Sequence, residues 1–187
     1  ARCTGFEDSG QAVTAHFADG REDQAYVLVG AEGVHSAVRA QLFGPAALRY
    51  RGYTAVRSIT PAGSVPLPRD GIETWGQGAR FGLGPTSGER VTWYAMWNAP
   101  EGARDAGDTT ARLRELFGGW HEPIPAIIAA TPAAAMIRND IYDRRPARTW
   151  SRARVALIGD AIHPMTPDLA QGACQAILDA TTLATCL

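Results

Sequence analysis

Cysteine is scarce in this 187-residue chain, and its spacing excludes two common uses of the residue. The three cysteines are Cys3, Cys174 and Cys186, an odd number without a Cys-x-x-Cys pair. Disulfide-stapled domains pair their cysteines, and structural zinc sites typically take ligands from a closely spaced Cys pair. The composition therefore argues against a disulfide framework and a zinc site, predicts no metal, and fits a reducing, cytoplasmic environment.

Excess charge and long apolar runs are also lacking. Lys and Arg number 18 against 19 Asp and Glu, so the formal net charge of -1 predicts neither a nucleic-acid nor a membrane partner. The polar N-terminus has no signal-peptide core, and the apolar run near Ile127 is interrupted by Pro132. With 45% hydrophobic residues, the chain can bury one good core or two small ones.

A glycine-rich dinucleotide loop is the third absence. Gly76-Gln77-Gly78 and Gly82-Leu83-Gly84 come nearest, but neither has the GxGxxG spacing between a strand and a helix. The chain also begins without methionine and ends within a predicted helix at Leu187. We therefore expect a piece of a longer chain.

The most informative stretch begins at residue 155. Residues 155–158 form a short apolar run typical of a strand buried in a parallel sheet, and Gly159 ends it. Asp160 then lies beyond the carboxyl end of the strand, where open α/β sheets bind ligands. The alternative is an ordinary strand-to-helix unit whose aspartate only caps the loop.

A helix is predicted to begin at Gln171-Gly172, after a loop stiffened by Pro164 and Pro167. The small residues at its start leave room for a flat ligand to approach the first free N–H groups. Its apolar residues recur at helical spacing and predict one narrow stripe packed on a sheet. They are Ala173, Ala176, Ile177, Ala180, Leu183, Ala184 and Leu187.

A β-hairpin is predicted near the N-terminus. Residues 13–17 alternate between apolar and polar, and Asp19-Gly20 supply the turn. The return strand is predicted over residues 26–29, and it runs into a turn at Gly30. The end of this strand therefore offers a second place for a ligand.

The turn after the hairpin carries charged side chains. Glu32 places a carboxylate at the strand end, and Ser36 is suited to cap a helix that reaches Phe43. Arg39 lies in the first turn of that helix, and an arginine fork is suited to phosphate oxygens. The alternative is a plain turn with a solvated arginine.

Residues 49–145 differ in pattern from the rest and indicate a second domain. They contain longer segments of alternating apolar and polar residues, aromatic residues and Gly/Pro turns. Strands are predicted at 53–60, 79–84, 90–97 and 137–142, and helices after Asp108 and Pro125. One face of the 90–97 strand carries Val91, Trp93, Ala95 and Trp97, and the other carries Thr92, Tyr94 and Met96. We expect one face to pack on helices and the other to line a cavity, the alternative being that both are core.

Both motifs resemble those of a known family. The pattern Gly-Asp-Ala-x-His-Pro-x-x-Pro from Gly159, followed by Gln171-Gly172 and Asp179-Ala180, resembles the second flavin fingerprint of FAD-dependent aromatic hydroxylases. These are the single-component flavoprotein monooxygenases related to para-hydroxybenzoate hydroxylase. Residues 30–39 resemble the family's other internal motif, Gly-Ala-Asp-Gly-x-x-Ser-x-Val-Arg, which serves FAD and NAD(P)H. The chain departs twice, with Glu32 for aspartate and Ala170 for glycine.

The resemblance implies an α/β fold in which residues 1–47 and 147–187 form the back half of a Rossmann-like FAD-binding domain. Residues 48–146 are then an inserted α+β substrate-binding domain built on a mixed or antiparallel sheet. The missing partner is the N-terminal half of the FAD domain, which carries the pyrophosphate loop. The isolated segment is therefore expected to hold FAD weakly or not at all and to be inactive.

The implied activity is hydroxylation of a small aromatic or heteroaromatic molecule with NAD(P)H and O2. By resemblance, NAD(P)H reduces FAD and a C4a-hydroperoxyflavin passes one oxygen to the ring, so no catalytic side chain is needed. His163, in a turn before proline, is expected to be structural. The leading alternative is a related flavoprotein reductase or halogenase, and a third is a non-catalytic truncated scaffold.

The resemblance also assigns site residues. Asp160 is expected to hydrogen-bond the ribityl or ribose part of FAD, and Arg39 to contact pyrophosphate or pyridine nucleotide. The predicted cofactor set is Gly30, Glu32, Arg39, Gly159, Asp160, Pro167, Gln171, Gly172 and Ala173. The predicted substrate wall comes from the hairpin arms and consists of Arg80, Thr92, Tyr94 and Met96.

Overall fold

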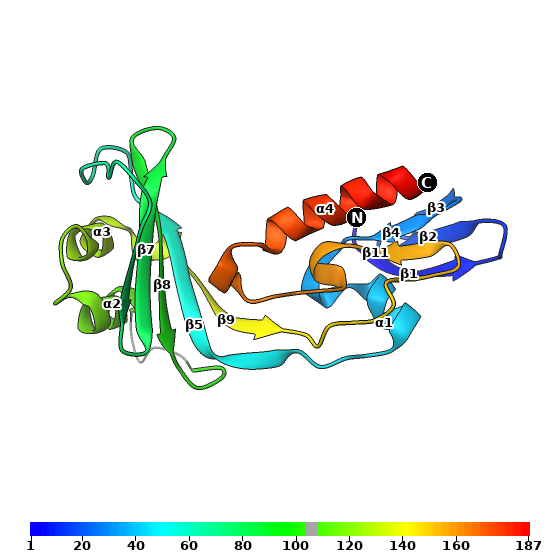
Figure 1. The fold of residues 1–187 in the computed structure, drawn as a ribbon, viewed down its shortest axis with the longest axis horizontal. Helices are drawn as coiled ribbons and strands as arrows, with labels where there is room; N and C mark the ends of the chain where they lie inside the picture. Colours follow the sequence, from blue (N-terminus) through cyan, green and yellow to red (C-terminus); the bar gives the residue numbers. More distant parts are fainter. Residues whose placement is uncertain (104–107) are drawn as a thin grey trace. The chain divides into compact units, whose positions relative to one another are not determined.

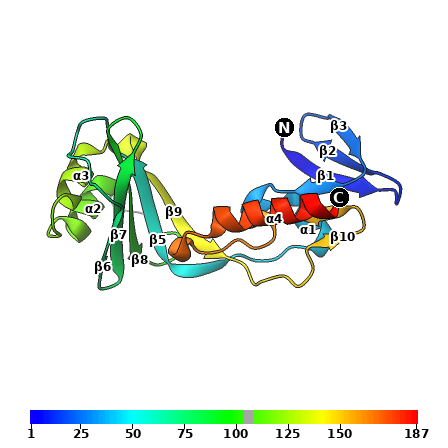
Figure 2. The same cartoon turned by 45° about the horizontal axis from the view of Figure 1, so that its top comes forward.

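The computed structural model describes residues 1–103 and 108–187, which form two compact units. Ala1–Arg51 and Tyr142–Leu187 make up the first unit, and Gly52–Ile141 make up the second (Figures 1 and 2). From the sequence, the boundaries between the two domains are predicted after residues 47 and 146. Among the described residues, no helix is both long and apolar enough to span a bilayer.

The first unit opens with a small antiparallel sheet. Its strands are β1 (Cys3–Asp8), β2 (Val13–Phe17) and β3 (Glu22–Ala25), in that order. The predicted return strand is therefore wrong, because the chain turns back at once after Asp19-Gly20 and pairs Glu22 with His16. Polar residues 22–25 carry no apolar alternation, and the apolar run that follows them belongs to another sheet.

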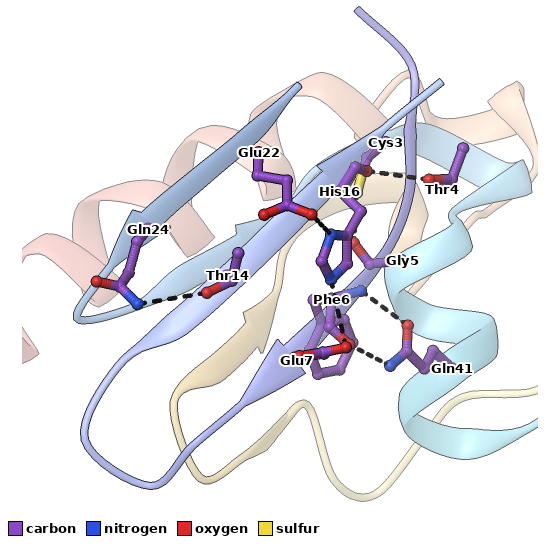
Figure 3. Close-up of polar contacts among 10 residues, drawn as sticks. All are labelled: Cys3, Thr4, Gly5, Phe6, Glu7, Thr14, His16, Glu22, Gln24 and Gln41. Atoms are coloured by element: carbon purple, nitrogen blue, oxygen red, sulfur yellow. Dashed lines mark hydrogen bonds and ion pairs between the residues drawn. The ribbon is translucent and has the colours of Figure 1, made fainter. Parts of the chain in front are cut away.

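One side chain of helix α1 (Ala37–Phe43) holds the edge strand β1 in place (Figure 3). The Phe6 N–H donates to Gln41 Oε1 at 3.0 Å, and Gln41 Nε2 donates to the Phe6 carbonyl at 2.6 Å. A Cβ on Gly5 would lie 2.9 Å from Gln41 Oε1, so glycine leaves room for this clamp. The amide therefore completes the hydrogen bonding that an edge strand lacks.

A second sheet brings the two sequence motifs together. Its order is β10 (Ser151–Arg152), β11 (Val155–Leu157) and β4 (Leu28–Gly30). Strands β11 and β4 are parallel, and Leu157 lies opposite Gly30. Because parallel strands end at the same edge, the segments that follow them leave the sheet side by side. A core covers this sheet, formed by Val13, Val38, Leu42, Val155, Leu157, Ala161 and Ile162.

Helical segments follow both parallel strands. The short 3-10 turn η1 (Gly33–His35) and helix α1 follow β4, and the Ser36 hydroxyl accepts from the Arg39 N–H at 2.9 Å, confirming the predicted cap. Turns η3 (Gly159–Ala161) and η4 (Pro167–Leu169) and helix α4 (Gly172–Cys186) follow β11. The predicted helix is present, and no α4 residue is buried in the described structure, so no element of these residues covers its apolar stripe.

The second unit is a five-stranded sheet with helices on one face. The strand order is β6 (Ile72–Gly76), β7 (Ala79–Thr86), β8 (Arg90–Asn98), β5 (Arg49–Ile59) and β9 (Ile137–Asp143). The pairs β6/β7, β7/β8 and β5/β8 are antiparallel. The sequence predicted all of these strands except β6, whose polar residues and flanking glycines conceal it.

The covered face of this sheet is the one that the sequence selected. Helices α2 (Thr109–Phe117) and α3 (Ile124–Ala130) lie on the same side of the sheet in both views, and the turn η2 (Ala133–Ala135) follows them (Figures 1 and 2). The Asp108 carboxylate accepts from the Thr110 N–H at 3.0 Å and caps α2 as predicted. The buried cluster includes Val91, Trp93, Ala95, Trp97, Leu113, Phe117, Ile124, Ile127 and Ile128.

Candidate functional site

The two motifs open into one hollow at the carboxyl ends of β4 and β11. The hollow has a volume of about 550 Å³, and both motifs contribute to its wall. From the first motif come Ala31 and Gly33. From the second come Gly159, Asp160, Pro167, Gly172 and Ala173 among others. Five of the nine predicted cofactor residues therefore line a single site.

Gly159 makes a sharp turn in the wall of this hollow. Its φ of +58° lies in the left-handed region, and a Cβ there would lie 3.1 Å from the Ala176 Cβ of α4. Glycine therefore permits both the turn and the close approach of the helix. Asp160 follows directly and is exposed, so its carboxylate can accept a hydrogen bond from a ligand hydroxyl.

The start of α4 is the second polar feature of the hollow. No side chain caps this helix at Gln171, so its first N–H groups are left for another acceptor. Gly172 and Ala173 line the hollow with no bulky side chain, whereas Gln171 is not part of the wall. The positive end of the helix dipole favours an electron-rich ligand here.

Asp179, in α4, holds the turn at Gly159 in place by hydrogen bonding. Its Oδ2 accepts from the Gly159 N–H at 2.8 Å and lies 2.6 Å from His163 Nε2. The two side chains are 10% and 15% exposed, so the pair is mostly removed from water. His163 also contacts the Trp150 ring at 5.0 Å between centroids and does not line the hollow. Asp179 is part of the motif that begins at Gly159, but no contact was predicted for it from the sequence.

Two predicted cofactor residues have local roles in the structure. A Cβ on Gly30 would lie 2.6 Å from the Leu157 side chain, so this glycine allows close packing inside the sheet. The Glu32 carboxylate accepts from the Ser36 hydroxyl at 2.7 Å and from the Val38 N–H at 3.1 Å. Glu32 thus caps α1, and it lines a neighbouring hollow of about 710 Å³.

Arg39 lies near a second arginine, Arg144, which the sequence did not single out. Arg39 is 9% exposed and donates to the Gly44 carbonyl, and Arg144 donates to the Val34 carbonyl. Arg39 Nε and Arg144 Nε and Nη1 are buried with no partner among the described residues. Burial lowers the pKa of Arg144, and the charge of Arg39 lowers it further. Unpaired buried donors beside two like charges suit an anionic group.

The predicted substrate wall lies on the open face of the second unit's sheet. Tyr94 donates its hydroxyl proton to Glu73 Oε1 at 2.8 Å, and Arg80 Nε lies 3.5 Å from the same oxygen. Arg80 also contacts Met96 Sδ at 3.0 and 3.2 Å and lies over the Trp75 ring. Burial and the Glu73 contact raise the pKa of Tyr94 to about 12.

A hollow of about 320 Å³ lies on this face. Thr92, Tyr94 and Glu73 line it, whereas Arg80 and Met96 lie beside it. A Cβ on Gly82 would overlap the Tyr94 ring, so the tyrosine lies flat across this glycine. The sequence did not single out Glu73, because β6 was not recognised as a strand. In the described part of the chain, no three metal-ligating side chains are grouped.

Comparison with known proteins decides the family. The profile of the family described as "FAD binding domain" matches residues 1–187. The chain belongs to this family of FAD-binding monooxygenases. The resemblance inferred from the two motifs is thereby confirmed.

Individual members of the FAD-binding monooxygenase family align over nearly the whole chain. Aurachin C monooxygenase/isomerase of Stigmatella aurantiaca is 47% identical over all of this chain and 49% of its own length. The 6-hydroxynicotinate 3-monooxygenase of Pseudomonas fluorescens is 37% identical over 98% of this chain and 50% of its own. HpxO of Klebsiella pneumoniae, solved with FAD and uric acid, is 35% identical with a TM-score of 0.90, covering 98% and 48%. The chain thus spans about half the length of these relatives.

Ala170 stands where the resemblance places a family glycine, and the structure shows how alanine is accommodated. Its φ of +50° and ψ of +26° are left-handed, and it lines the 550 Å³ hollow. An L-residue pays about 1–2 kcal/mol for this conformation, whereas glycine does not. The loop therefore keeps a glycine-like turn with a methyl group added to its wall.

Proposed function

We propose that this chain contributes part of the flavin site and the substrate-binding unit of an FAD-dependent monooxygenase that hydroxylates a small aromatic or heteroaromatic molecule with NAD(P)H and O2. The observation that carries the proposal is the convergence of both motifs on one hollow at the ends of two adjacent parallel strands. When bound, FAD supplies the redox and oxygen chemistry. The first unit is then the back half of a Rossmann-like domain, and the second binds substrate.

The residues of the 550 Å³ hollow fit the flavin part of FAD. Asp160 offers an exposed carboxylate to a ribityl or ribose hydroxyl. The uncapped start of α4 offers N–H groups and a positive dipole end to a carbonyl edge of a flat ring. Gly159, Gly172 and Ala173 keep the wall thin enough for such a ring to approach the backbone. The pyrophosphate loop is expected outside these 187 residues.

Asp160→Ala tests the flavin assignment. A hydrogen bond to a charged acceptor contributes about 1.5–3 kcal/mol, so the variant is expected to bind FAD about 10- to 150-fold more weakly. Quenching of flavin fluorescence in the protein that carries this chain measures the affinity. Asp168→Ala is the matched control, since it removes the same charge from an exposed turn nearby. Equal affinities of the two variants would refute the role of Asp160.

Arg39 and Arg144 are proposed to receive the phosphate oxygens of the nicotinamide cofactor. Their three unpaired buried donors and close positive charges provide an anion site in the first unit. Arg144→Ala is expected to raise the NAD(P)H concentration for half-maximal flavin reduction about 10-fold or more. Stopped-flow absorbance measures this, and the exposed neighbour Arg145→Ala is the control. A half-maximal concentration matching that of the control would exclude Arg144 from the site.

Oxygen transfer is tested separately from cofactor binding. Labelled dioxygen is expected to enter the aromatic product only when NAD(P)H is present. Reduction without label in the product would indicate a flavoprotein reductase, and halide in the product would indicate a halogenase. Either outcome would overturn the proposed hydroxylation while leaving the flavin assignment standing.

A further inference from the structure

In the hollow on the open face of the second unit's sheet, the hydroxyl proton of Tyr94 is already used in a hydrogen bond to Glu73. Tyr94 donates to Glu73 Oε1 at 2.8 Å, and the contact with this carboxylate helps to keep the phenol protonated. A hydroxyl has one proton and two acceptor lone pairs. Towards a ligand in the hollow, Tyr94 can therefore act only as an acceptor.

Glu73 is held in the position that this requires. Its Oε1 receives the Tyr94 proton and lies 3.5 Å from Arg80 Nε, and its Oε2 accepts from the Trp75 indole N–H at 3.1 Å. Three side chains from β7, β8 and β6 itself thus orient one carboxylate. Gly82 completes the arrangement, because any larger residue there would displace the Tyr94 ring.

The charge that a ligand meets first is negative. The Glu73 side chain is 30% exposed and lines the hollow, whereas the Arg80 side chain is 10% exposed and lies outside its wall. Arg80 is also covered by Trp75 and contacts Met96 Sδ. The polar wall of the hollow therefore consists of the Thr92 hydroxyl, an accepting tyrosine and a carboxylate.

We propose that this hollow selects an uncharged ring bearing an O–H or ring N–H that donates to Tyr94, and rejects rings bearing a carboxylate, with Glu73 as the specificity-determining residue. This inference rests on the proposed function, whose substrate it narrows. A ring without a donor leaves the Tyr94 oxygen unpaired, and a ring carboxylate adds repulsion from Glu73. Sites built to hydrogen-bond a substrate hydroxyl discriminate strongly against analogues that lack it.

Three probes of one shape test the selection: 2-naphthol, naphthalene and 2-naphthoate. Their binding to the purified protein at neutral pH is measured by calorimetry and by quenching of tryptophan fluorescence, because Trp75 lies in the same cluster. The naphthol is expected to bind about 10-fold or more tightly than either analogue. A naphthoate that binds as well as the naphthol, or the absence of binding by any probe, overturns the proposal.

Two variants separate the hydrogen bond from the charge. Glu73→Gln is expected to raise naphthoate affinity about 10-fold, because the charge is gone and the new amide can donate to Tyr94 and free the tyrosine proton. Tyr94→Phe is expected to make the affinities for naphthol and naphthalene equal, because the acceptor of the naphthol proton is gone. The affinity for naphthoate is expected to stay low, because Glu73 remains. Glu115→Gln, on the helix-covered side of the sheet, is the control and is expected to leave all three affinities unchanged.

The outcomes distinguish this inference from the proposed function. An unchanged order of probe affinities in Glu73→Gln refutes the specificity role even where the protein binds FAD and incorporates labelled oxygen. Conversely, in the longer protein that carries this chain, the expected order without FAD binding or oxygen incorporation supports the hollow and refutes the monooxygenase. If Glu73→Gln fails to fold, the wild-type order and Tyr94→Phe still decide the question.

Discussion

Asp179→Ala is expected to lower the free energy of unfolding by about 2–5 kcal/mol and to weaken FAD binding at the same time. The variant removes the acceptor of two bonds, from the Gly159 N–H and from His163 Nε2. Each buried donor left without a partner costs about 1–3 kcal/mol. The Gly159 turn also positions Asp160, so the loss of its anchor is expected to change the hollow that is proposed to hold flavin.

Urea unfolding followed by circular dichroism, together with a flavin titration, checks this expectation. Thr182→Ala, an exposed position on the same helix, is the control and is expected to change stability by less than about 0.5 kcal/mol. Asp179→Asn keeps an oxygen that can accept from Gly159, so it is expected to fall between the two. Stability of Asp179→Ala equal to that of Thr182→Ala would show that the bonds of Asp179 to Gly159 and His163 contribute nothing to stability.

Phe117→Ala is expected to destabilise the second unit by about 3–5 kcal/mol, the usual cost of removing a fully buried aromatic ring. Phe117 is 0% exposed and lies between three rings. Its centroid is 5.6 Å from that of Phe81, 6.5 Å from Trp97 and 4.9 Å from Trp120, in edge-on geometries. Because two of these rings are tryptophans, the free energy of unfolding can be measured directly by tryptophan fluorescence.

The same variant tests the division into two units. Phe117 lies in the second unit, and the 550 Å³ hollow that is proposed to hold flavin lies in the first, whose core is separate. Molecules of Phe117→Ala that remain folded are therefore expected to bind FAD with parental affinity. Glu115→Ala, exposed on the same helix, is the stability control. Loss of flavin affinity in the folded variant would show that the two units do not act separately.

The local features that follow from short-range chemistry were predicted correctly. Ser36 and Asp108 cap their helices because a side-chain oxygen near free N–H groups depends only on neighbouring residues. The two faces of β8 follow from strand alternation alone, and the helices cover the more apolar one. The flavin motif could be recognised because Gly159, Asp160 and the start of α4 are contiguous in the chain.

By itself, the sequence determined the family motifs, the caps, most strands and the face of the second sheet that is buried, because each depends on residues close together in the chain. Only the tertiary structure decided which distant groups meet. It paired β4 with β11, placed Arg144 near Arg39, and brought Glu73 to Tyr94 across strands that local pattern could not align. It also left the apolar stripe of α4 exposed in the described residues, because periodicity predicts a face but not the element that covers it.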